Sequence, residues 1–236
     1  AAALSAERAA LEAIATGLQV HTLPGAAEGD LLIGTIDGTA VALLRCGVGK
    51  VAAATAVAAA SALKPRCIIS VGSAGALHAG HTIGDVVIST EVLQHDFAAV
   101  SASGFTLFGY GSDWPSNGDP LLRSDPAMTK IAAAAARSTG TARGFTVSSG
   151  RITTGDWFVN DAATRDAIAT RTGADLVEME GAAIAYVAQQ FGTPWIVIRS
   201  VSDAGDGAAA PSFDEYLALA SANAAAIVRA TLPLLP

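Results

Sequence analysis

Two short, nearly continuous apolar runs constrain the fold of this chain most strongly. They span residues 67–71 and 195–201, and Arg199 interrupts the second run near its end. Strands that are apolar on both faces are typical of the centre of a sheet that helices cover on both sides. We therefore expect both runs to be central strands of an α/β fold.

Alanine-rich helical segments alternate with β-rich segments along the whole chain. The expected strands are 31–36, 41–45, 67–71, 85–93, 145–153 and 195–201. The expected helices are 5–16, 50–63, 126–137, 161–171, 180–191 and 213–232. This alternation predicts helices on both faces of one sheet, and a chain of 236 residues suits a single domain, 1–236.

The composition disfavours several classes of partner. A net charge of −7 and the lack of a basic run argue against binding to a nucleic-acid backbone. No apolar run approaches the roughly 20 residues that span a bilayer, and we find no secretory leader. Cys46 and Cys67 are expected to be buried, reduced thiols without metal-ligand spacing. These features predict a cytoplasmic protein without a structural metal.

The strongest chemical signal is a set of three carboxylates. Glu178 and Glu180 lie where a strand-like run changes into an alanine-rich helix, and Asp203 follows the next apolar run. In an extended backbone Glu178 and Glu180 share a face, from which both could accept bonds from ribose hydroxyls. The structural alternatives are a helix-capping acid for the pair and a turn aspartate for Asp203. Because carboxylates are costly beside a core, we expect the chemistry here.

Two glycine segments are typical of turns near a ligand. Gly47-Val48-Gly49-Lys50 lacks the distant glycine and the Ser/Thr of a phosphate-binding loop, so it predicts a tight strand-to-helix turn. Gly72-Ser73-Ala74-Gly75-Ala76 follows a central strand. It either brings the backbone close to a ligand or is a plain turn.

Three further features have mainly structural interpretations. His95-Asp96 lacks a nucleophile, so a structural or interface histidine is favoured over an acid/base pair. Spacing alone favours core positions for Trp157 and Phe158, with stacking on a flat ligand as the alternative. Residues 105–123, rich in Gly, Ser, Asp and Pro, predict a long loop over the site or an interface.

A series of short motifs occurs in a fixed order along nearly the whole chain. They are Ala3-Leu4-Ser5-Ala6-Glu7, Gly47-Val48-Gly49-Lys50-Val51, Gly72-Ser73-Ala74-Gly75, Ile83-Gly84-Asp85-Val86-Val87, Gly155-Asp156-Trp157-Phe158-Val159-Asn160, Val177-Glu178-Met179-Glu180-Gly181-Ala182-Ala183, Arg199-Ser200-Val201-Ser202-Asp203 and Ser212-Phe213-Asp214-Glu215. Together they resemble the nucleoside phosphorylase/nucleosidase superfamily, most closely its 5'-methylthioadenosine/S-adenosylhomocysteine nucleosidases. The resemblance implies a single-domain three-layer α/β/α fold with a central twisted mixed sheet.

The resemblance also implies a reaction, the hydrolysis of the N-glycosidic bond of 5'-thio-substituted adenosines without a cofactor. The products are adenine and a 5-substituted ribose. Asp203 matches the family's general acid at adenine N7, and Glu7 matches the carboxylate that activates water. Ser73 and Arg199 match residues that line the water site.

The substrate-binding candidates follow from the same resemblance. Glu180 matches the acceptor of ribose hydroxyls, and its negative charge would stabilise a cationic sugar in the transition state. Phe158 matches the ring that stacks on adenine, and the Val159 backbone matches the group that contacts the base edge. The remaining candidates are Met179 under the sugar, Glu178 as a supporting or ribose-edge residue, Ser202, and an apolar 5' pocket of Leu4, Val48 and Phe213.

The resemblance implies a homodimer, in which residues 100–108 of one subunit complete the partner's 5' pocket. Ser70 stands where phosphorylases of the superfamily have a phosphate-binding arginine, and this difference favours water as the nucleophile. A purine nucleoside phosphorylase, a futalosine-type hydrolase and a nucleoside-binding protein without turnover remain alternatives.

The chain departs from the family pattern in two segments. The family's first strand precedes the Ala3-Leu4 step, so the resemblance predicts that the native protein begins earlier. Residues 96–123 are longer than the family pattern, which bears on the 5' pocket and on the breadth of substrates.

Overall fold

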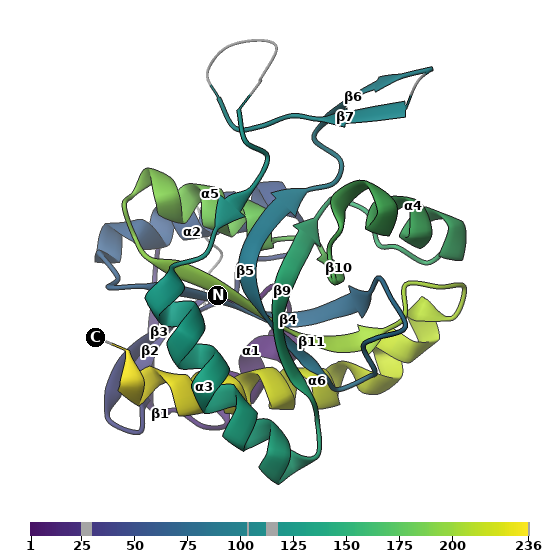
Figure 1. Ribbon diagram of the computed structural model, residues 1–236. Coiled ribbons are helices and arrows are strands. Elements are labelled where there is room, and N and C mark those ends of the chain that lie inside the picture. Colours follow the sequence, from purple (N-terminus) through teal and green to yellow (C-terminus); the bar gives the residue numbers. More distant parts are fainter. Residues whose placement is uncertain (25–29, 103, 112–117, 236) are drawn as a thin grey trace.

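A central mixed sheet organises the molecule (Figure 1). The computed structural model describes residues 1–24, 30–102, 104–111 and 118–235. The strand order of this sheet is β11-β4-β10-β9-β5-β8. Its members are β4 (Ile68–Ala76), β5 (Val86–Gln94), β8 (Leu122–Arg123), β9 (Val147–Thr154), β10 (Leu176–Glu178) and β11 (Trp195–Asp203). The expected α/β class with a mixed central sheet is confirmed.

The sheet closes on itself because β11 pairs with β5 as well as with β4. β11 runs parallel to β4 and antiparallel to β5. β10 runs antiparallel to β4, so that Val177 pairs with Gly75, and on the other side of β4 Gly75 pairs with Asp203. The backbone of Gly75 thus lies between the ends of β10 and β11, which carry the carboxylates predicted from the sequence.

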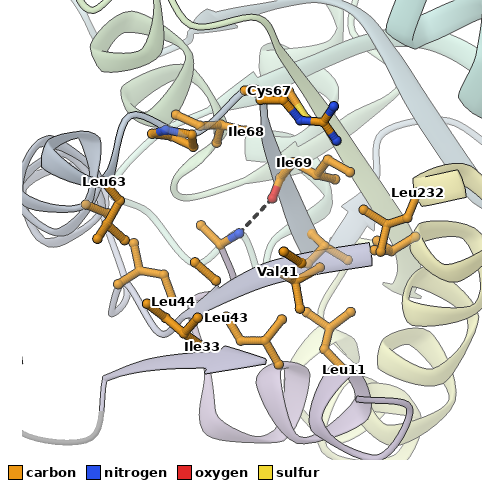
Figure 2. Close-up of a pocket in the computed structure, with 18 of the residues that line it drawn as sticks. Leu11, Ile33, Val41, Leu43, Leu44, Leu63, Cys67, Ile68, Ile69 and Leu232 are labelled. Carbon is orange, nitrogen blue, oxygen red and sulfur yellow. Dashed lines mark hydrogen bonds between the residues drawn. The ribbon is translucent and has the colours of Figure 1, made fainter. Parts of the chain in front are cut away.

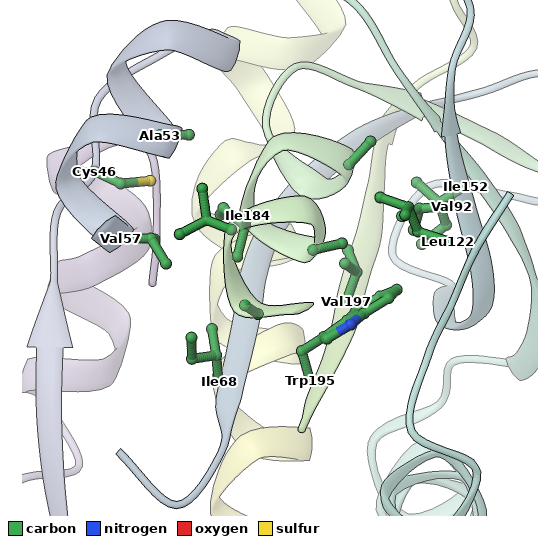
Figure 3. Close-up of a cluster of buried hydrophobic side chains, with 14 of the residues drawn as sticks. Cys46, Ala53, Val57, Ile68, Val92, Leu122, Ile152, Ile184, Trp195 and Val197 are labelled. Atoms are coloured by element: carbon green, nitrogen blue, oxygen red, sulfur yellow. The ribbon is translucent and has the colours of Figure 1, made fainter. Parts of the chain in front are cut away.

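Apolar side chains fill the space on each face of the sheet. On one face, α2 (Lys50–Ala60) and α5 (Gly181–Gln190) contribute buried side chains such as Val57 and Ile184. These belong to one cluster with Ile68 of β4 and Val197 of β11 (Figure 3). Burial of such side chains contributes about 1.5–3 kcal/mol each to folding.

The opposite face is covered by three other helices, α1 (Ser5–Glu12), α3 (Pro126–Arg143) and α6 (Ala209–Thr231). Ile196 and Ile198 of β11 point to this face, and Val197 between them points to the other, as strand geometry requires. Both predicted central strands are therefore buried on two sides, as their sequences indicated.

The helix α6, with the turn Leu232–Leu234 that follows it, is long and apolar enough by length and composition to cross a membrane. The prediction that no apolar run approaches the length of a membrane span was therefore wrong for this segment. In the structure α6 packs against β11, β4, α1 and α3, and it buries Ala220, Ala224 and Ile227. Packing in the protein core thus explains its apolar character.

Several expected boundaries were wrong for local reasons. The first helix ends at Glu12 instead of residue 16, and it is followed by β1 (Thr16–His21). This strand was missed because nearly all its residues are exposed and its apolar alternation is limited to Leu18 and Val20. It forms a separate antiparallel sheet with β2 (Leu31–Ile36) and β3 (Thr39–Leu44). The helix α3 continues to Arg143 because Gly144, with φ of 81°, ends it in the left-handed conformation.

Other differences concern strand ends and the expected loop. Residues 72–76, expected as a turn, are the second half of β4. Residues 105–123 contain the end of β7 (Gly104–Leu107) and β8, so the segment is only partly loop. β7 pairs with β6 (Ala98–Ser101) in a hairpin that projects from the molecule (Figure 1). Residues 112–117 of the expected loop lie outside the described residues. The helix α4 (Ala162–Thr172) agrees closely with its prediction.

An apolar groove of about 470 Å³ separates β3 from the start of β4 (Figure 2). The Ala1 amine lies in it and donates to the Ile69 carbonyl at 2.7 Å. Among the described residues that line the groove there is no carboxylate and no histidine. The groove is therefore a poor candidate for acid–base chemistry.

Candidate active site

A cavity of about 310 Å³ lies where β4, β10 and β11 converge. Three distant segments of the chain meet there, since Glu7, Glu180 and Asp203 all line it. The described residues that line it are Ala3, Leu4, Glu7, Val48, Ser73, Ala74, Gly75, Trp157, Phe158, Val159, Val177, Glu178, Met179, Glu180, Ser202, Asp203 and Phe213. Every site residue predicted from the sequence except Arg199 is in this set.

Glu7 is buried at the start of α1, and its carboxylate is held by four donors. Oε2 accepts from the amides of Ala3 and Leu4 at 3.1 and 3.0 Å, an interaction that also caps the helix. Oε1 accepts from the amide and the hydroxyl of Ser73, both at 2.9 Å. Gly72 leaves room for this arrangement, because an added Cβ would lie 2.6 Å from Oε1. Glu7 therefore lies against β4 in one fixed position.

Asp203 approaches β4 at Gly75, which by strand geometry lies roughly 7 Å along the strand from Ser73. Its Oδ1 accepts from the Gly205 amide at 2.9 Å, and Ser202 Oγ donates to Oδ2 at 2.9 Å. Gly75 is again required, since an added Cβ would lie 2.8 Å from Oδ1. Burial raises the pKa of Asp203, although these hydrogen bonds oppose the shift. The site thus makes this carboxyl easier to protonate than an exposed aspartate.

Glu178 is an anchoring residue whose carboxylate is fully occupied. It accepts from the amides of Glu180 and Gly181, which begin α5, and from the Thr154 hydroxyl. Arg199 Nη2 donates to its Oε2 at 2.5 Å. The helix-capping alternative is therefore confirmed for Glu178. Arg199 is itself buried and is not among the residues that line the cavity.

Glu180 accepts fewer hydrogen bonds than Glu178. Its Oε1 accepts from the Gly49 amide at 2.9 Å, and its Oε2 lies 3.8 Å from Arg199 Nη2. Burial, and then the neighbouring Glu178 charge, raise the pKa of Glu180 to about 8. Protonation of Glu180 is therefore much easier than that of an exposed glutamate.

The predicted turn at Gly47-Val48-Gly49-Lys50 supplies that amide. Gly47 and Gly49 have φ of 78° and 89°, conformations that favour glycine, and Gly49 is the N-cap of α2. The expected strand-to-helix turn is confirmed. Its backbone approaches the carboxylate of Glu180 in place of a phosphate.

The aromatic pair in the loop after β9 is not part of the core. Trp157 and Phe158 are 43% and 48% exposed, so the core positions favoured by spacing were wrong. Both rings line the cavity, where Phe158 meets Phe213 edge to face at 5.8 Å. Trp157 meets the fully buried His95 at 5.2 Å, so His95 supports the loop as a structural residue. An exposed ring at the mouth of a cavity is available to stack on a flat ligand.

Sequence reasoning missed the glycines that make these contacts possible. Gly72 and Gly75 were interpreted either as residues that bring the backbone close to a ligand or as a plain turn, whereas each leaves the space that a carboxylate occupies. Their small size in the middle of an apolar strand was the available signal. Of the two predicted buried thiols, Cys46 is buried and Cys67 is half-buried.

Comparisons with known proteins identify a family, related sequences and similar structures. The chain matches the Phosphorylase superfamily over residues 2–233. It is 41% identical over 202 residues to a 5'-methylthioadenosine/S-adenosylhomocysteine nucleosidase of Haemophilus influenzae (strain 86-028NP), covering 83% of this chain and 81% of that protein. It also resembles the crystal structure of the nucleosidase of that name from Neisseria meningitidis, in complex with methylthio-immucillin-A. The TM-score is 0.86 at 34% identity, over 99% of this chain and 97% of that chain. A futalosine hydrolase of Helicobacter pylori has a TM-score of 0.84 at 23% identity, over 99% and 96% of the two chains, which shows likeness of fold alone.

Proposed function

The chain belongs to the 5'-methylthioadenosine/S-adenosylhomocysteine nucleosidases of the phosphorylase superfamily, and we propose that it hydrolyses the N-glycosidic bond of 5'-thio-substituted adenosines. The substrates are 5'-methylthioadenosine, S-adenosylhomocysteine and, by the same chemistry, 5'-deoxyadenosine. The products are adenine and the 5-substituted ribose. The observation that carries the proposal is the convergence of Glu7, Glu180 and Asp203 on one cavity.

In the proposed reaction, Asp203 is the general acid. As the bond between ribose C1' and adenine N9 breaks, its electron pair passes into the purine ring and N7 accepts the Asp203 proton. Adenine then leaves as a neutral base. The burial that raises the pKa of Asp203 supports this role, because the acid must carry its proton near neutral pH.

Glu7 is the proposed base that accepts a proton from the attacking water. Three of its four hydrogen-bond donors are main-chain amides, so its position does not depend on a mobile side chain. The fourth donor is the Ser73 hydroxyl, which can rotate and orient a water toward C1'. The water oxygen bonds to C1', and its proton passes to Glu7.

Glu180 is the proposed ribose clamp, with Met179 packing under the sugar. In its protonated form, which burial favours, this carboxyl can donate to one ribose hydroxyl and accept from another. In its ionised form the same carboxylate accepts from both hydroxyls and stabilises the positive charge that develops on the sugar. Arg199 and Glu178 act behind it, where their ion pair fixes the start of α5.

The adenine site is formed by the loop after β9 and the end of β11. Phe158, half-exposed at the cavity wall, stacks on the base, and the Val159 backbone contacts the base edge. Ser202 supports the site through its hydrogen bond with Asp203. Leu4, Val48 and Phe213 line the same cavity and form the apolar 5' pocket. An apolar lining suits a thioether and would leave a 5'-hydroxyl unpaired.

The charge of the cavity lining favours water over phosphate as the nucleophile. The lining contains four carboxylates, Glu7, Glu178, Glu180 and Asp203, and among the described residues no Lys, Arg or His. Ser70, in the position of the phosphorylases' arginine, is buried in β4 and is not part of the lining. A phosphate dianion would find no cation in this lining to balance its charge and would lie near the Glu7 carboxylate.

We further propose that residues 1–236 form one domain, which acts as a homodimer in the cytoplasm. The family match over residues 2–233 supports the single domain. The β6–β7 hairpin supports the dimer, because it projects from the molecule and exposes Val100 and Phe105 at 71% and 44% (Figure 1). Two free cysteines suit a reducing compartment.

An adenine-release assay tests the proposed function. The purified protein is given 5'-methylthioadenosine, S-adenosylhomocysteine, 5'-deoxyadenosine, adenosine and inosine, each with and without phosphate. We expect adenine release from the first two at equal rates with and without phosphate. A phosphate requirement would instead identify a purine nucleoside phosphorylase. A preference for a bulky aromatic 5' substituent, tested in parallel, would identify a futalosine-type hydrolase. Tight nucleoside binding without release would leave only a binding protein.

A further inference from the structure

A polar cluster just outside the cavity ties together two loops that form its wall. We call it the loop clamp, and it consists of Lys50, Asp96 and Asp156. These residues lie at the start of α2, after β5 and after β9, respectively. None of the three lines the cavity. The reaction described above therefore gives them no role.

Asp96 is the centre of the clamp because each of its oxygens binds a different loop. Oδ1 accepts from Lys50 Nζ at 2.6 Å, and Oδ2 accepts from the Asp156 amide at 2.9 Å. Asp156 completes the connection, since its Oδ1 accepts from the Lys50 amide at 2.8 Å. One carboxylate thus joins the turn before α2 to the loop after β9.

The two joined segments carry groups that face the cavity. The turn provides the Gly49 amide, which binds Glu180 at 2.9 Å. The loop carries Phe158 and Val159, which line the adenine side of the cavity. In contrast, Glu7 and Asp203 are held against β4 and have no bond to the clamp among the described residues.

The surroundings of the clamp make it stronger than an ordinary surface ion pair. The side chains of Asp96 and Lys50 are only 10% and 19% exposed, so water screens them little. Burial opposes ionisation of Asp96, but the hydrogen bonds from Lys50 and from the Asp156 amide lower its pKa on balance. Lys50 Nζ also donates to Gln94 at 2.9 Å, which fixes it on β5.

We propose that Asp96 is a positioning residue of the active site. Through its bonds to Lys50 and Asp156, it sets the distance between the Phe158–Val159 segment and Glu180. This inference rests on the proposed function and concerns the same site. It adds a residue that contacts neither substrate nor reacting atoms. Its consequence is selective, because the loop binds the base while the acid and the water-activating carboxylate remain on β4.

Four variants test the clamp: Asp96→Asn, Lys50→Met, the double variant, and the control Asp37→Asn. Asp37 accepts two hydrogen bonds from Arg229 at 2.7 and 2.8 Å in an exposed ion pair and does not line the cavity. Three quantities are measured on the full chain: the dissociation constant of adenine, kcat and KM for 5'-methylthioadenosine, and amide hydrogen exchange over residues 157–160. Thermal unfolding confirms that each variant is folded, and Lys50→Met replaces Asp96→Asn if the latter is not.

The expected result is a loss concentrated in base binding. Asp96→Asn should weaken adenine binding and raise KM by about tenfold, the effect of losing a hydrogen bond with a charged group. It should change kcat less than KM and speed up exchange at residues 157–160. Because Lys50 and Asp96 contact each other, the loss of adenine affinity in the double variant should be smaller than the product of the two single losses. The control should match the wild type.

Two results would overturn the clamp. One is an Asp96→Asn protein whose adenine affinity and exchange at residues 157–160 both match the control. The other is a double variant in which the two single effects multiply. Failure of the proposed function would give a different result, namely a wild type that releases no adenine. The comparison of amide exchange between the variants and the control could still be made in that case.

Discussion

Gly72→Ala is the substitution whose effect the structure specifies most closely. Gly72 lies in the buried strand β4, and its missing Cβ leaves the space that the Glu7 carboxylate occupies. An alanine Cβ would lie 2.6 Å from Glu7 Oε1 and 3.0 Å from Cδ, whereas such contacts are essentially never below 3.0 Å. The carboxylate therefore has to retreat by about half an ångström.

The atom that has to move is the one that contacts Ser73. Glu7 Oε1 accepts from the Ser73 amide and hydroxyl at 2.9 Å each, so a retreat lengthens both bonds. Weakening two charge-assisted hydrogen bonds should cost about 1–3 kcal/mol, partly offset by the lower entropy of the unfolded alanine variant. A misplaced water-activating carboxylate should reduce kcat by about 100-fold or more, within the range of general base catalysis.

The assay measures kcat for adenine release, the dissociation constant of adenine and the unfolding free energy of Gly72→Ala. Adenine affinity should stay close to that of the wild type, because the proposed adenine site, Phe158 and Val159, lies on the loop after β9 and not on β4. Gly80→Ala is the matched control, since its Cβ would meet nothing within 4 Å and its backbone is not left-handed. A folded Gly72→Ala protein with kcat within threefold of the wild type would refute the role of Glu7.

Two further predictions concern the buried charges. Glu180 has its usual pKa of 4.5 when unfolded but about 8 when folded, so its contribution to stability is full below about pH 4.5 and is lost as pH rises to about 8. The wild-type unfolding free energy should therefore fall from pH 5 to pH 8 more steeply than that of Glu180→Gln, and equal slopes in denaturant titrations would contradict this. Arg199→Met should destabilise the fold by about 3–5 kcal/mol, because it leaves Glu178 buried without its cation. Arg229→Met, in an exposed ion pair, should have a much smaller effect in the same titration, and similar losses in both variants would count against the argument.

The central strands could be predicted from sequence because burial on both faces leaves a continuous apolar run. The strands that were missed, such as β1 and β6, are exposed, so their residues carry no such pattern. Periodicity likewise could not assign Trp157 and Phe158, since an aromatic residue at a cavity mouth and one in the core look alike in sequence.

Most carboxylates of the site could be identified from the sequence, but their arrangement in space could not. Local patterns marked Glu178, Glu180 and Asp203, whereas Glu7 entered only through the family resemblance, because 196 residues separate it from Asp203. The distinct environments of Glu178 and Glu180 depend on long-range partners, Arg199 for the first and the Gly49 amide for the second. No local pattern contains that information.

The most direct test of the proposed mechanism is a single-turnover measurement with Asp203→Asn and 5'-methylthioadenosine. Asparagine keeps the size of the side chain but cannot deliver the proton that adenine N7 needs. We predict that adenine release slows by at least about 100-fold, while the dissociation constant of adenine changes by less than about tenfold, the effect of one hydrogen bond. Release at a rate near that of the wild type would contradict the assignment of Asp203 as the general acid.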